Sequence, residues 1–222
     1  MDKLQYNVKT ILDSVAGRAV LLAATKTVEP SIINRIYDMG IHTIGENRVN
    51  ELIEKYDFLD KRFDIHFIGT LQRNKVKYII DKVSLIHSLD SLALADEIEL
   101  RAAKIGKVQD CLVEINVGGE ESKGGIDYDE VDDFLSKLSD YKHINIRGLM
   151  CIPPRVAQNE NNLLNFKKIK QKFIDIKQKK VDNRNMDILS MGMTHDYLDA
   201  IQCGATVVRI GEGIFGKRNQ QQ

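Results

Sequence analysis

Short runs of apolar residues alternate along the chain with longer segments in which apolar residues recur every three or four positions. The short runs are rich in Val, Ile and Leu, which is typical of buried strands. They lie at residues 20–25, 41–44, 65–68, 85–88, 111–117, 144–151, 187–190 and 206–210. The longer segments have a helical period, and after an opening helix near 2–15 they lie near 30–39, 46–60, 71–81, 91–105, 128–140, 160–180 and 194–203.

Several of the helical segments carry start and stop signals. Pro30 opens one of them, where proline costs no hydrogen bond because the first N–H groups of a helix have no partner. Ser91 precedes another as a candidate N-cap, and Gly106 ends it. Gly40 and Gly204 end two further segments in the same way. These signals predict short connections between strands and helices.

The alternation of strand and helix predicts a parallel sheet, because parallel neighbours need a crossover that is usually helical. Eight strands in 222 residues fit a closed (β/α)8 TIM barrel better than an open doubly wound sheet. A Rossmann fold is disfavoured because no glycine fingerprint opens a strand–helix–strand unit. We therefore expect residues 1–222 to form one α/β barrel domain, with residues 1–18 as the opening helix and residues 219–222 as a frayed tail.

Composition narrows the class of protein. The 32 basic and 32 acidic residues give a formal net charge of zero, which argues against a nucleic-acid-binding protein. No apolar run approaches the roughly 18 residues of a membrane span, and the N-terminal segment lacks the apolar stretch of a signal peptide. Three widely separated cysteines suit a reducing compartment. We expect a cytoplasmic globular protein that binds neither nucleic acid nor membrane.

In a barrel of this kind the chemistry lies where the strands run into the following loops. Lys26 directly follows the first predicted strand. Apolar neighbours there would disfavour its ammonium form and provide a free amine that can attack an aldehyde. The alternative is an ordinary solvated surface lysine.

The loops after the seventh and eighth strands of such barrels often bind phosphate. Ser190 and Thr194 flank the first of these loops, and Gly211 follows the last strand. Small residues allow backbone N–H groups to approach an anion, and the hydroxyls add donors. The alternative is that the glycines only form turns and that Thr194 only caps the helix at 194–203.

Arg209 lies inside an otherwise apolar strand, VVRIG. A guanidinium cannot be neutralised, so its burial requires an acceptor, either a carboxylate of another strand or a ligand atom at the barrel mouth. Asn47 follows the second strand, where helix capping accounts for it equally well. We interpret His66 and His87 as core histidines. The five histidines lack the spacing of metal ligands, so no metal site is expected.

These residues lie in motifs that together resemble one protein family. The motifs are AATKT, IGENRVNEL, HFIGTLQRNK, ESKGGI, RGLMCIPP, LSMGMTHDY and VRIGEGIFGKR. In this order, over about residues 20–218, they resemble the pyridoxal phosphate homeostasis protein family, also called the alanine racemase N-terminal-domain-like or proline-synthase-co-transcribed family.

The resemblance implies a barrel like the N-terminal domain of alanine racemase that binds pyridoxal 5′-phosphate (PLP). On the matching motifs it assigns six residues to the cofactor: Lys26 as the lysine of the internal aldimine, Ser190 or Thr194 with the Gly211 backbone as phosphate ligands, Arg209 as the partner of the pyridine nitrogen, and Asn47 in the pocket wall.

The resemblance also implies a function in PLP homeostasis and amino-acid and keto-acid balance, without established catalysis. Apo forms of PLP-dependent enzymes are the candidate acceptors of the cofactor. An arginine cannot accept the proton of a ring nitrogen, so a ring that faces Arg209 should be a weak electron sink. We expect a monomer, because nothing obliges a second subunit to complete the site.

The alternative is a PLP-dependent racemase or transaminase of low activity, or a Schiff-base aldolase. Such an enzyme needs an acid/base group beside the cofactor, for which Tyr197, His195 and Lys123 are the candidates. Lys123 lies in a glycine-rich loop and is also a candidate for a second, transient amine during cofactor transfer.

Overall fold

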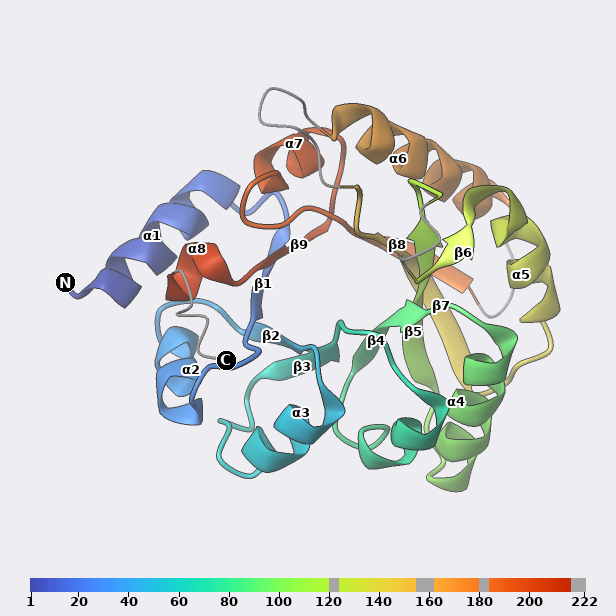
Figure 1. Cartoon of the computed structure of the whole chain (residues 1–222), viewed down its shortest axis with the longest axis horizontal. Coiled ribbons are helices and arrows are strands. Elements are labelled where there is room, and N and C mark those ends of the chain that lie inside the picture. The colour runs from blue at the N-terminus through green and yellow to red at the C-terminus, as the bar shows by residue number, and fades with distance from the viewer. Residues whose placement is uncertain (120–123, 155–161, 180–183, 217–222) are drawn as a thin grey trace.

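The computed structural model of the chain describes residues 1–119, 124–154, 162–179 and 184–216. Within these residues one sheet contains nine strands, and every pairing in it is parallel. The strands are β1 (Val20–Ala24), β2 (Thr43–Glu46), β3 (Asp64–Phe67), β4 (Leu85–Leu89), β5 (Gln109–Asn116), β6 (Ile126–Asp127), β7 (Ile144–Cys151), β8 (Arg184–Ser190) and β9 (Val207–Ile210). A pairing between β4 and β5 closes the sheet, so eight strands form a barrel and β6 is a short addition beside β5 (Figure 1). The predicted (β/α)8 barrel is confirmed.

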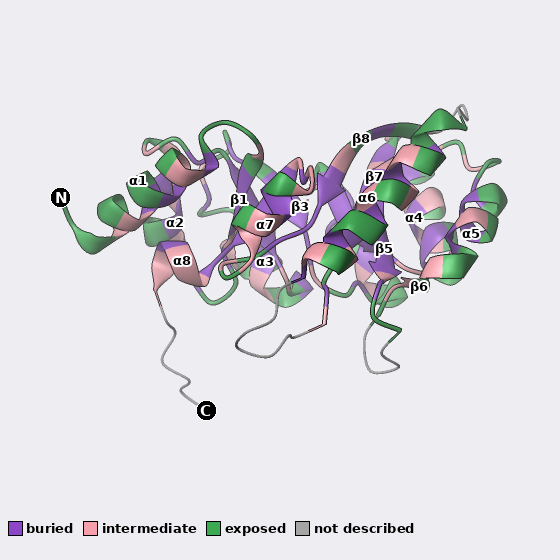
Figure 2. Ribbon diagram, turned by 90° about the horizontal axis from the view of Figure 1, so that it is seen from above, coloured by how far each residue is buried: buried purple, intermediate pink, exposed green. Residues whose placement is uncertain are grey.

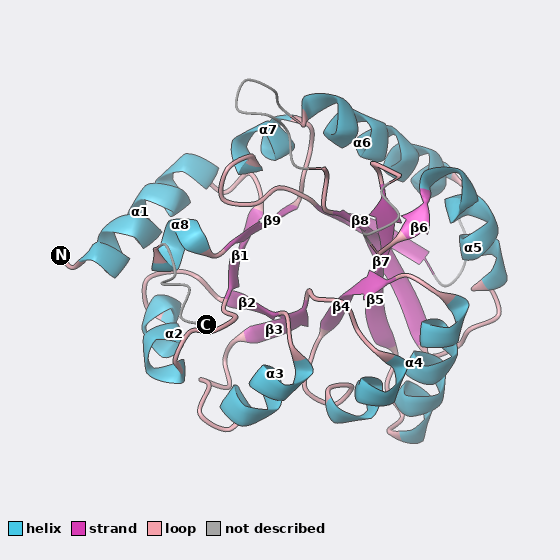
Figure 3. Ribbon diagram, viewed as in Figure 1, coloured by secondary structure: helices cyan, strands magenta, loops and turns pink. Residues whose placement is uncertain are grey.

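Helices surround the barrel on its outside (Figure 3). They are α1 (Lys3–Val15), α2 (Pro30–Tyr37), α3 (Val49–Tyr56), α4 (Leu92–Lys104), α5 (Val131–Lys137), α6 (Leu163–Gln178), α7 (Tyr197–Gln202) and α8 (Glu212–Phe215). Pro30 is the first residue of α2 and Ser91 caps α4, as predicted. Among the described residues, no helix is long and apolar enough to cross a membrane.

Several predicted elements differ from the structure. The strand predicted at 41–44 is β2 at Thr43–Glu46, and the helix after it begins only at Val49. The helix predicted at 71–81 is instead a 3₁₀ helix, η1, at Arg73–Tyr78. Side chains three residues apart share one side of a 3₁₀ helix, and Val76 and Ile79 are both fully buried. The 3₁₀ helix and its C-cap Ile79 therefore bury these two residues without a full helical face.

The core has two layers. Between the strands and the helices lies a continuous apolar cluster that includes Ile44, Phe67 and Ile36. Inside the barrel lie two small clusters, formed by Leu22, Ile68 and Val207 and by Leu85, Leu112 and Met150. The strands are buried on both faces, and the helices only on the face turned toward them (Figure 2). The barrel interior also contains buried polar side chains, which include His66, His87, Ser190 and Arg209.

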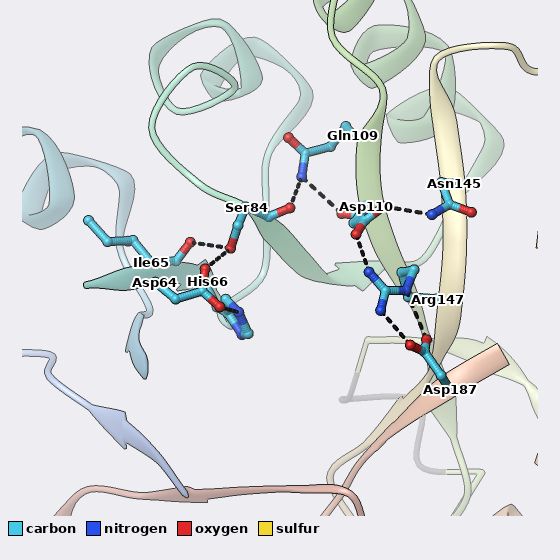
Figure 4. A network of polar contacts seen from close by, with 9 residues as sticks. All are labelled: Asp64, Ile65, His66, Ser84, Gln109, Asp110, Asn145, Arg147 and Asp187. Carbon is cyan, nitrogen blue, oxygen red and sulfur yellow. Dashed lines mark hydrogen bonds and ion pairs between the residues drawn. The ribbon is translucent and has the colours of Figure 1, made fainter. Parts of the chain in front are cut away.

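Polar side chains tie the strands together at the amino-terminal end of the barrel (Figure 4). Asp110 of β5 accepts hydrogen bonds from Asn145 Nδ2 at 2.7 Å and from Arg147 Nη1 at 2.5 Å. Arg147 also donates from Nε to Asp187 Oδ1 of β8 at 2.8 Å. This end of a (β/α)8 barrel generally carries stability rather than chemistry.

Gly148 of β7 lies close to the backbone of Ile188 in β8. It has a φ of +155°, and a Cβ added there would lie 1.7 Å from the carbonyl oxygen of Ile188. The register of the two strands shifts between Ile146 and Gly148. Only glycine allows this approach, because any side chain would push the strands apart.

We therefore expect Gly148→Ala to lower the free energy of unfolding by about 3 kcal/mol, measured by urea denaturation. The matched control is Gly106→Ala, where φ is +64° but no atom lies within 4 Å of the added Cβ. That variant meets only the left-handed backbone penalty of about 1 kcal/mol. Equal stability of the two variants would contradict the interpretation.

Candidate functional site

The candidate residues come from four strands that are neighbours in the sheet, in the order β2, β1, β9, β8. Because these strands are parallel, their carboxyl ends meet at one end of the barrel, here called the mouth (Figure 1). The residues near these strand ends are Asn47 after β2, Lys26 after β1, Arg209 in β9, Gly211 after it, Ser190 at the end of β8 and Thr194 in the following loop. The barrel thus brings the predicted residues to one side of its mouth.

Lys26 comes two residues after Ala24, which packs beside Leu22 inside the barrel. Lys26 itself lies in the turn that follows β1. The residue is exposed. The apolar burial expected from the sequence is therefore not found, and Lys26 lies at the solvent edge of the mouth.

The residues on both sides of Lys26 are held by α3 and β2. Thr25 is fully buried, and its hydroxyl donates to Glu46 Oε1 at 2.7 Å. Thr27 has a φ of +60°, a conformation that costs a β-branched residue about 1–2 kcal/mol. Its N–H donates to Glu51 Oε2 at 2.7 Å, which stabilises that conformation. The backbone at Lys26 is thus fixed from both sides.

Lys55 of α3 joins these contacts. Its Nζ donates to the carbonyl oxygen of Thr25 and to Glu46 Oε1, both at 3.0 Å, and to Glu51 Oε2 at 3.3 Å. Burial raises the pKa of the Glu46 carboxyl, although the Lys55 charge opposes the change. Burial also acts on Glu51, but hydrogen bonds from Thr27 and Lys55 outweigh it and lower the pKa of that carboxyl.

Arg209 lies inside the barrel and is only 5% exposed. Its Nη1 donates to Ser190 Oγ at 2.6 Å, and its Nη2 donates to the carbonyl oxygen of Cys151 at 2.9 Å. In the described part of the chain no carboxylate forms an ion pair with it. The sequence left two acceptors open for this buried guanidinium, a carboxylate of another strand or a ligand atom, and the carboxylate is not found among the described residues.

Ser190 and Thr194 lie in different surroundings. The Ser190 hydroxyl is fully buried and also lies 3.1 Å from His87 Nδ1, so it belongs to the barrel interior. Thr194 is half-buried and accepts a hydrogen bond from the N–H of Gly213 at 3.2 Å. The alternative that Thr194 caps a helix at 194–203 is wrong, because α7 begins at Tyr197 and its N-cap is Asp196.

The loops after β8 and β9 pack against each other at this point. The backbone N–H of Arg209 donates to the carbonyl of Gly192 at 3.0 Å, and Gly211 is the buried N-cap of α8. Residues 211–216 also have the spacing G-x-G-x-x-G. They follow the last strand of a closed barrel, and α8 has only four residues, so they do not open a dinucleotide-binding unit.

Asn47 is not part of a helix. The capping account is wrong, because the residue lies between β2 and the extended N-cap Arg48 of α3. Its Oδ1 is buried, with no hydrogen-bond partner among the described residues. A Cβ added at Gly69 would lie 2.1 Å from the Asn47 carbonyl oxygen, so the two loops meet closely. An unsatisfied buried oxygen costs free energy unless a ligand or water supplies a donor.

We compared the chain with protein-family models, curated proteins and solved structures. The family model for the alanine racemase N-terminal domain matches residues 1–219. The pyridoxal phosphate homeostasis protein of Aquifex aeolicus is 45% identical over 208 residues, which cover 91% of this chain and 90% of that protein. The chain belongs to the pyridoxal phosphate homeostasis protein family.

Solved structures show the same architecture. A protein of unknown function from Bifidobacterium adolescentis is 31% identical, with a TM-score of 0.91 and 97% of each chain covered. PipY of Synechococcus elongatus, solved with PLP bound, is 27% identical, with a TM-score of 0.84, 96% of this chain and 100% of that chain covered.

In this member of the homeostasis protein family, sequence reasoning overlooked an acidic residue inside the barrel. Glu114 of β5 is only 8% exposed. Burial and the nearby charge of Asp90 raise the pKa of its carboxyl to about 7, and the charge of Arg209 partly opposes the change. The sequence could have revealed Glu114, because it is the single charged residue in the apolar strand CLVEINV. Arg209 was found by the same feature in its own strand.

The buried contact between Lys55 and Glu46 leads to the first prediction for the site. Lys55→Met leaves the Glu46 carboxylate buried without its partner, so we expect the free energy of unfolding to fall by about 3 kcal/mol. The double variant Lys55→Met/Glu46→Gln should recover most of this loss. Urea denaturation measures both. The control is Lys9→Met, whose ion pair with Asp13 is exposed; a Lys55 variant as stable as this control would contradict the role of the buried pair.

Glu114 predicts a pH dependence of stability. Between about pH 4.5 and 7 the folded carboxyl keeps its proton while the unfolded one loses it, so the folded protein binds more protons. The free energy of unfolding therefore falls as the pH rises through this window, by about 3 kcal/mol for this group. Glu114→Gln should remove this part of the decline in the free energy of unfolding, measured by urea denaturation across the window. The exposed Glu54→Gln should retain it, and parallel curves for wild type and Glu114→Gln would refute the shift.

Proposed function

We propose that this chain binds pyridoxal 5′-phosphate at the barrel mouth and holds it for release to apo forms of PLP-dependent enzymes. In this proposal it acts in the cytoplasm, as a monomer and without catalytic turnover. The names of its relatives and the PLP in the PipY structure support the ligand. The chemistry of the residues at the mouth supports it independently.

The observation that carries the proposal is the surroundings of Arg209. Its guanidinium is buried at the mouth, and its hydrogen-bond acceptors are a hydroxyl and a carbonyl. A guanidinium has five N–H groups and no acceptor. The N–H groups that Ser190 and Cys151 do not use are available for a ring nitrogen, which must then be unprotonated.

The other residues fit the remaining parts of PLP. When bound, the cofactor supplies an aldehyde that condenses with amines and a ring that withdraws electrons. Lys26 would form a C=N bond with the aldehyde carbon, with loss of water. Thr194 and the Gly211 backbone lie where the loops after β8 and β9 meet, which suits a phosphate. Asn47 has a buried oxygen that needs a donor.

This assignment gives Ser190 a different role from that of a phosphate ligand. Its hydroxyl is fully buried and lies within hydrogen-bond distance of Arg209 and His87. A phosphate would have to displace one of these partners to reach it. We therefore assign the phosphate to Thr194 and the support of Arg209 to Ser190.

Holding the cofactor is favoured over turning over a substrate, because a ring nitrogen that only accepts from Arg209 withdraws electrons weakly. Of the candidate acid/base groups, the Tyr197 hydroxyl forms a hydrogen bond of 2.8 Å with Oγ of Ser14, which lies in α1. Lys123 lies outside the described residues. The thiol of Cys151 has its pKa raised by burial to about 12, so it is no nucleophile at neutral pH.

One observation favours a second function, a racemase or related Schiff-base enzyme of low activity. The Glu114 carboxyl, with a pKa of about 7, can gain or lose a proton at neutral pH near Arg209. Racemisation needs acid/base groups on both faces of the cofactor, and Glu114 supplies at most one.

The test is the absorbance of the purified protein with added PLP. We expect a visible band in wild type, its loss in Lys26→Ala, and its retention in Lys9→Ala, a control on the outer surface of α1. Borohydride reduction and peptide mapping of the wild type should place the label on Lys26. A label on another lysine would contradict the site, and steady turnover of L- or D-amino acids by the loaded protein would favour the second function.

A further inference from the structure

A continuous series of close polar contacts crosses the inside of the barrel from the mouth to the opposite end. Arg209 Nη1 donates to Ser190 Oγ at 2.6 Å, and Ser190 Oγ lies 3.1 Å from His87 Nδ1. His87 Nε2 lies 3.0 Å from His66 Nδ1. His66 Nε2 lies 2.9 Å from Asp64 Oδ2. The first four residues are more than nine-tenths buried, whereas the Asp64 side chain is 51% exposed.

Asp64 fixes the direction of the hydrogen bonds in this series. Figure 4 shows its carboxylate between the ring of His66 and the hydroxyl of Ser84, which donates to Oδ1. A carboxylate accepts only, so His66 carries hydrogen on Nε2. In the neutral imidazole, Nδ1 of His66 then accepts from Nε2–H of His87. His87 Nδ1 in turn accepts from the Ser190 hydroxyl, whose oxygen accepts from Arg209.

The reverse order fails at Ser190. If His87 carried its hydrogen on Nδ1, the Ser190 oxygen would face two donors, His87 and Arg209. The hydrogen of its own hydroxyl would then have no acceptor among the described residues, in a fully buried position. Burial, together with the charge of Arg209, also holds the pKa of His87 well below its usual value, so the ring is neutral.

We propose that His66 and His87 are positioning residues for Arg209. They orient the Ser190 hydroxyl so that its oxygen is free to accept from the guanidinium, and they connect the mouth with Asp64 at the opposite end of the barrel. The orientation concerns the protein alone. The connection rests on the proposed function, because it requires PLP at the mouth.

The orientation is tested by long-range ¹H–¹⁵N NMR of the ligand-free chain, which reports the tautomer of each histidine. We expect His66 and His87 both in the Nε2–H form. His143 is the internal control, because its Nδ1 lies 2.9 Å from Glu99 Oε1 and should carry hydrogen. An Nδ1–H form at His87 overturns the proposal.

The connection is tested by adding PLP to the wild type and to two His87 variants. His87→Asn keeps a polar atom where Nδ1 faces Ser190 but has none at the position of Nε2. We expect it to bind PLP within about threefold of the wild type, whereas His87→Phe should bind about tenfold more weakly or worse. Equal affinity of the Phe variant and the wild type contradicts the positioning role.

The ¹⁵N signals of His66 test the connection between the mouth and Asp64 separately from the positioning of Arg209. In the wild type they should shift when PLP binds, in His87→Asn they should not, and those of His143 should stay in place in both. An identical His66 shift in the two proteins overturns the connection. If wild type binds no PLP, the proposed function fails, while the tautomers of the ligand-free chain still decide the orientation.

Discussion

The mouth of the barrel is arranged around the buried charge of Arg209. A guanidinium keeps its charge at any accessible pH, so its burial is stable only where acceptors are already in place. Ser190 and the Cys151 carbonyl provide them from β8 and β7. The sheet order sets these distances, since β9 pairs with β8, which pairs in turn with β7.

The same sheet order places Lys26 on the other side of Arg209. β1 pairs with β9 in a register that sets Leu22 level with Arg209, so Lys26 follows four residues nearer the mouth. The end of β1 would otherwise be an unsupported loop. The hydrogen bonds of Thr25 and Thr27 to two glutamates fix it, and Lys55 balances the charge of both carboxylates. An amine that must meet a ligand in one geometry gains from such support, because its backbone needs no ordering when the ligand binds.

The sequence predicted the barrel because its strand and helix periods alternate without a break, and it singled out Arg209 because a charge stood in an apolar strand. Glu114 carried the same signal and was overlooked. The series of hydrogen bonds from Arg209 to Asp64 could not be predicted from the sequence, for a different reason. His66 and His87 are 21 residues apart and His87 and Ser190 are 103 apart, so only barrel closure shows that they meet. The alternative of helix capping at Asn47 and Thr194 is wrong because α3 and α7 begin further along the chain, at Val49 and Tyr197.

The interior hydrogen bonds bear on the proposal that this chain holds the cofactor rather than uses it in catalysis. When every hydrogen in the series points from Arg209 toward Asp64, the Ser190 oxygen accepts from the guanidinium on the interior side. The remaining N–H groups of Arg209 then point to the mouth. A donor fixed in this way suits a ring nitrogen that stays unprotonated. Strong carbanion stabilisation needs the opposite, an acid that protonates the ring. On the proposed function, the arrangement that makes the burial of Arg209 possible therefore favours holding the cofactor over rapid catalysis.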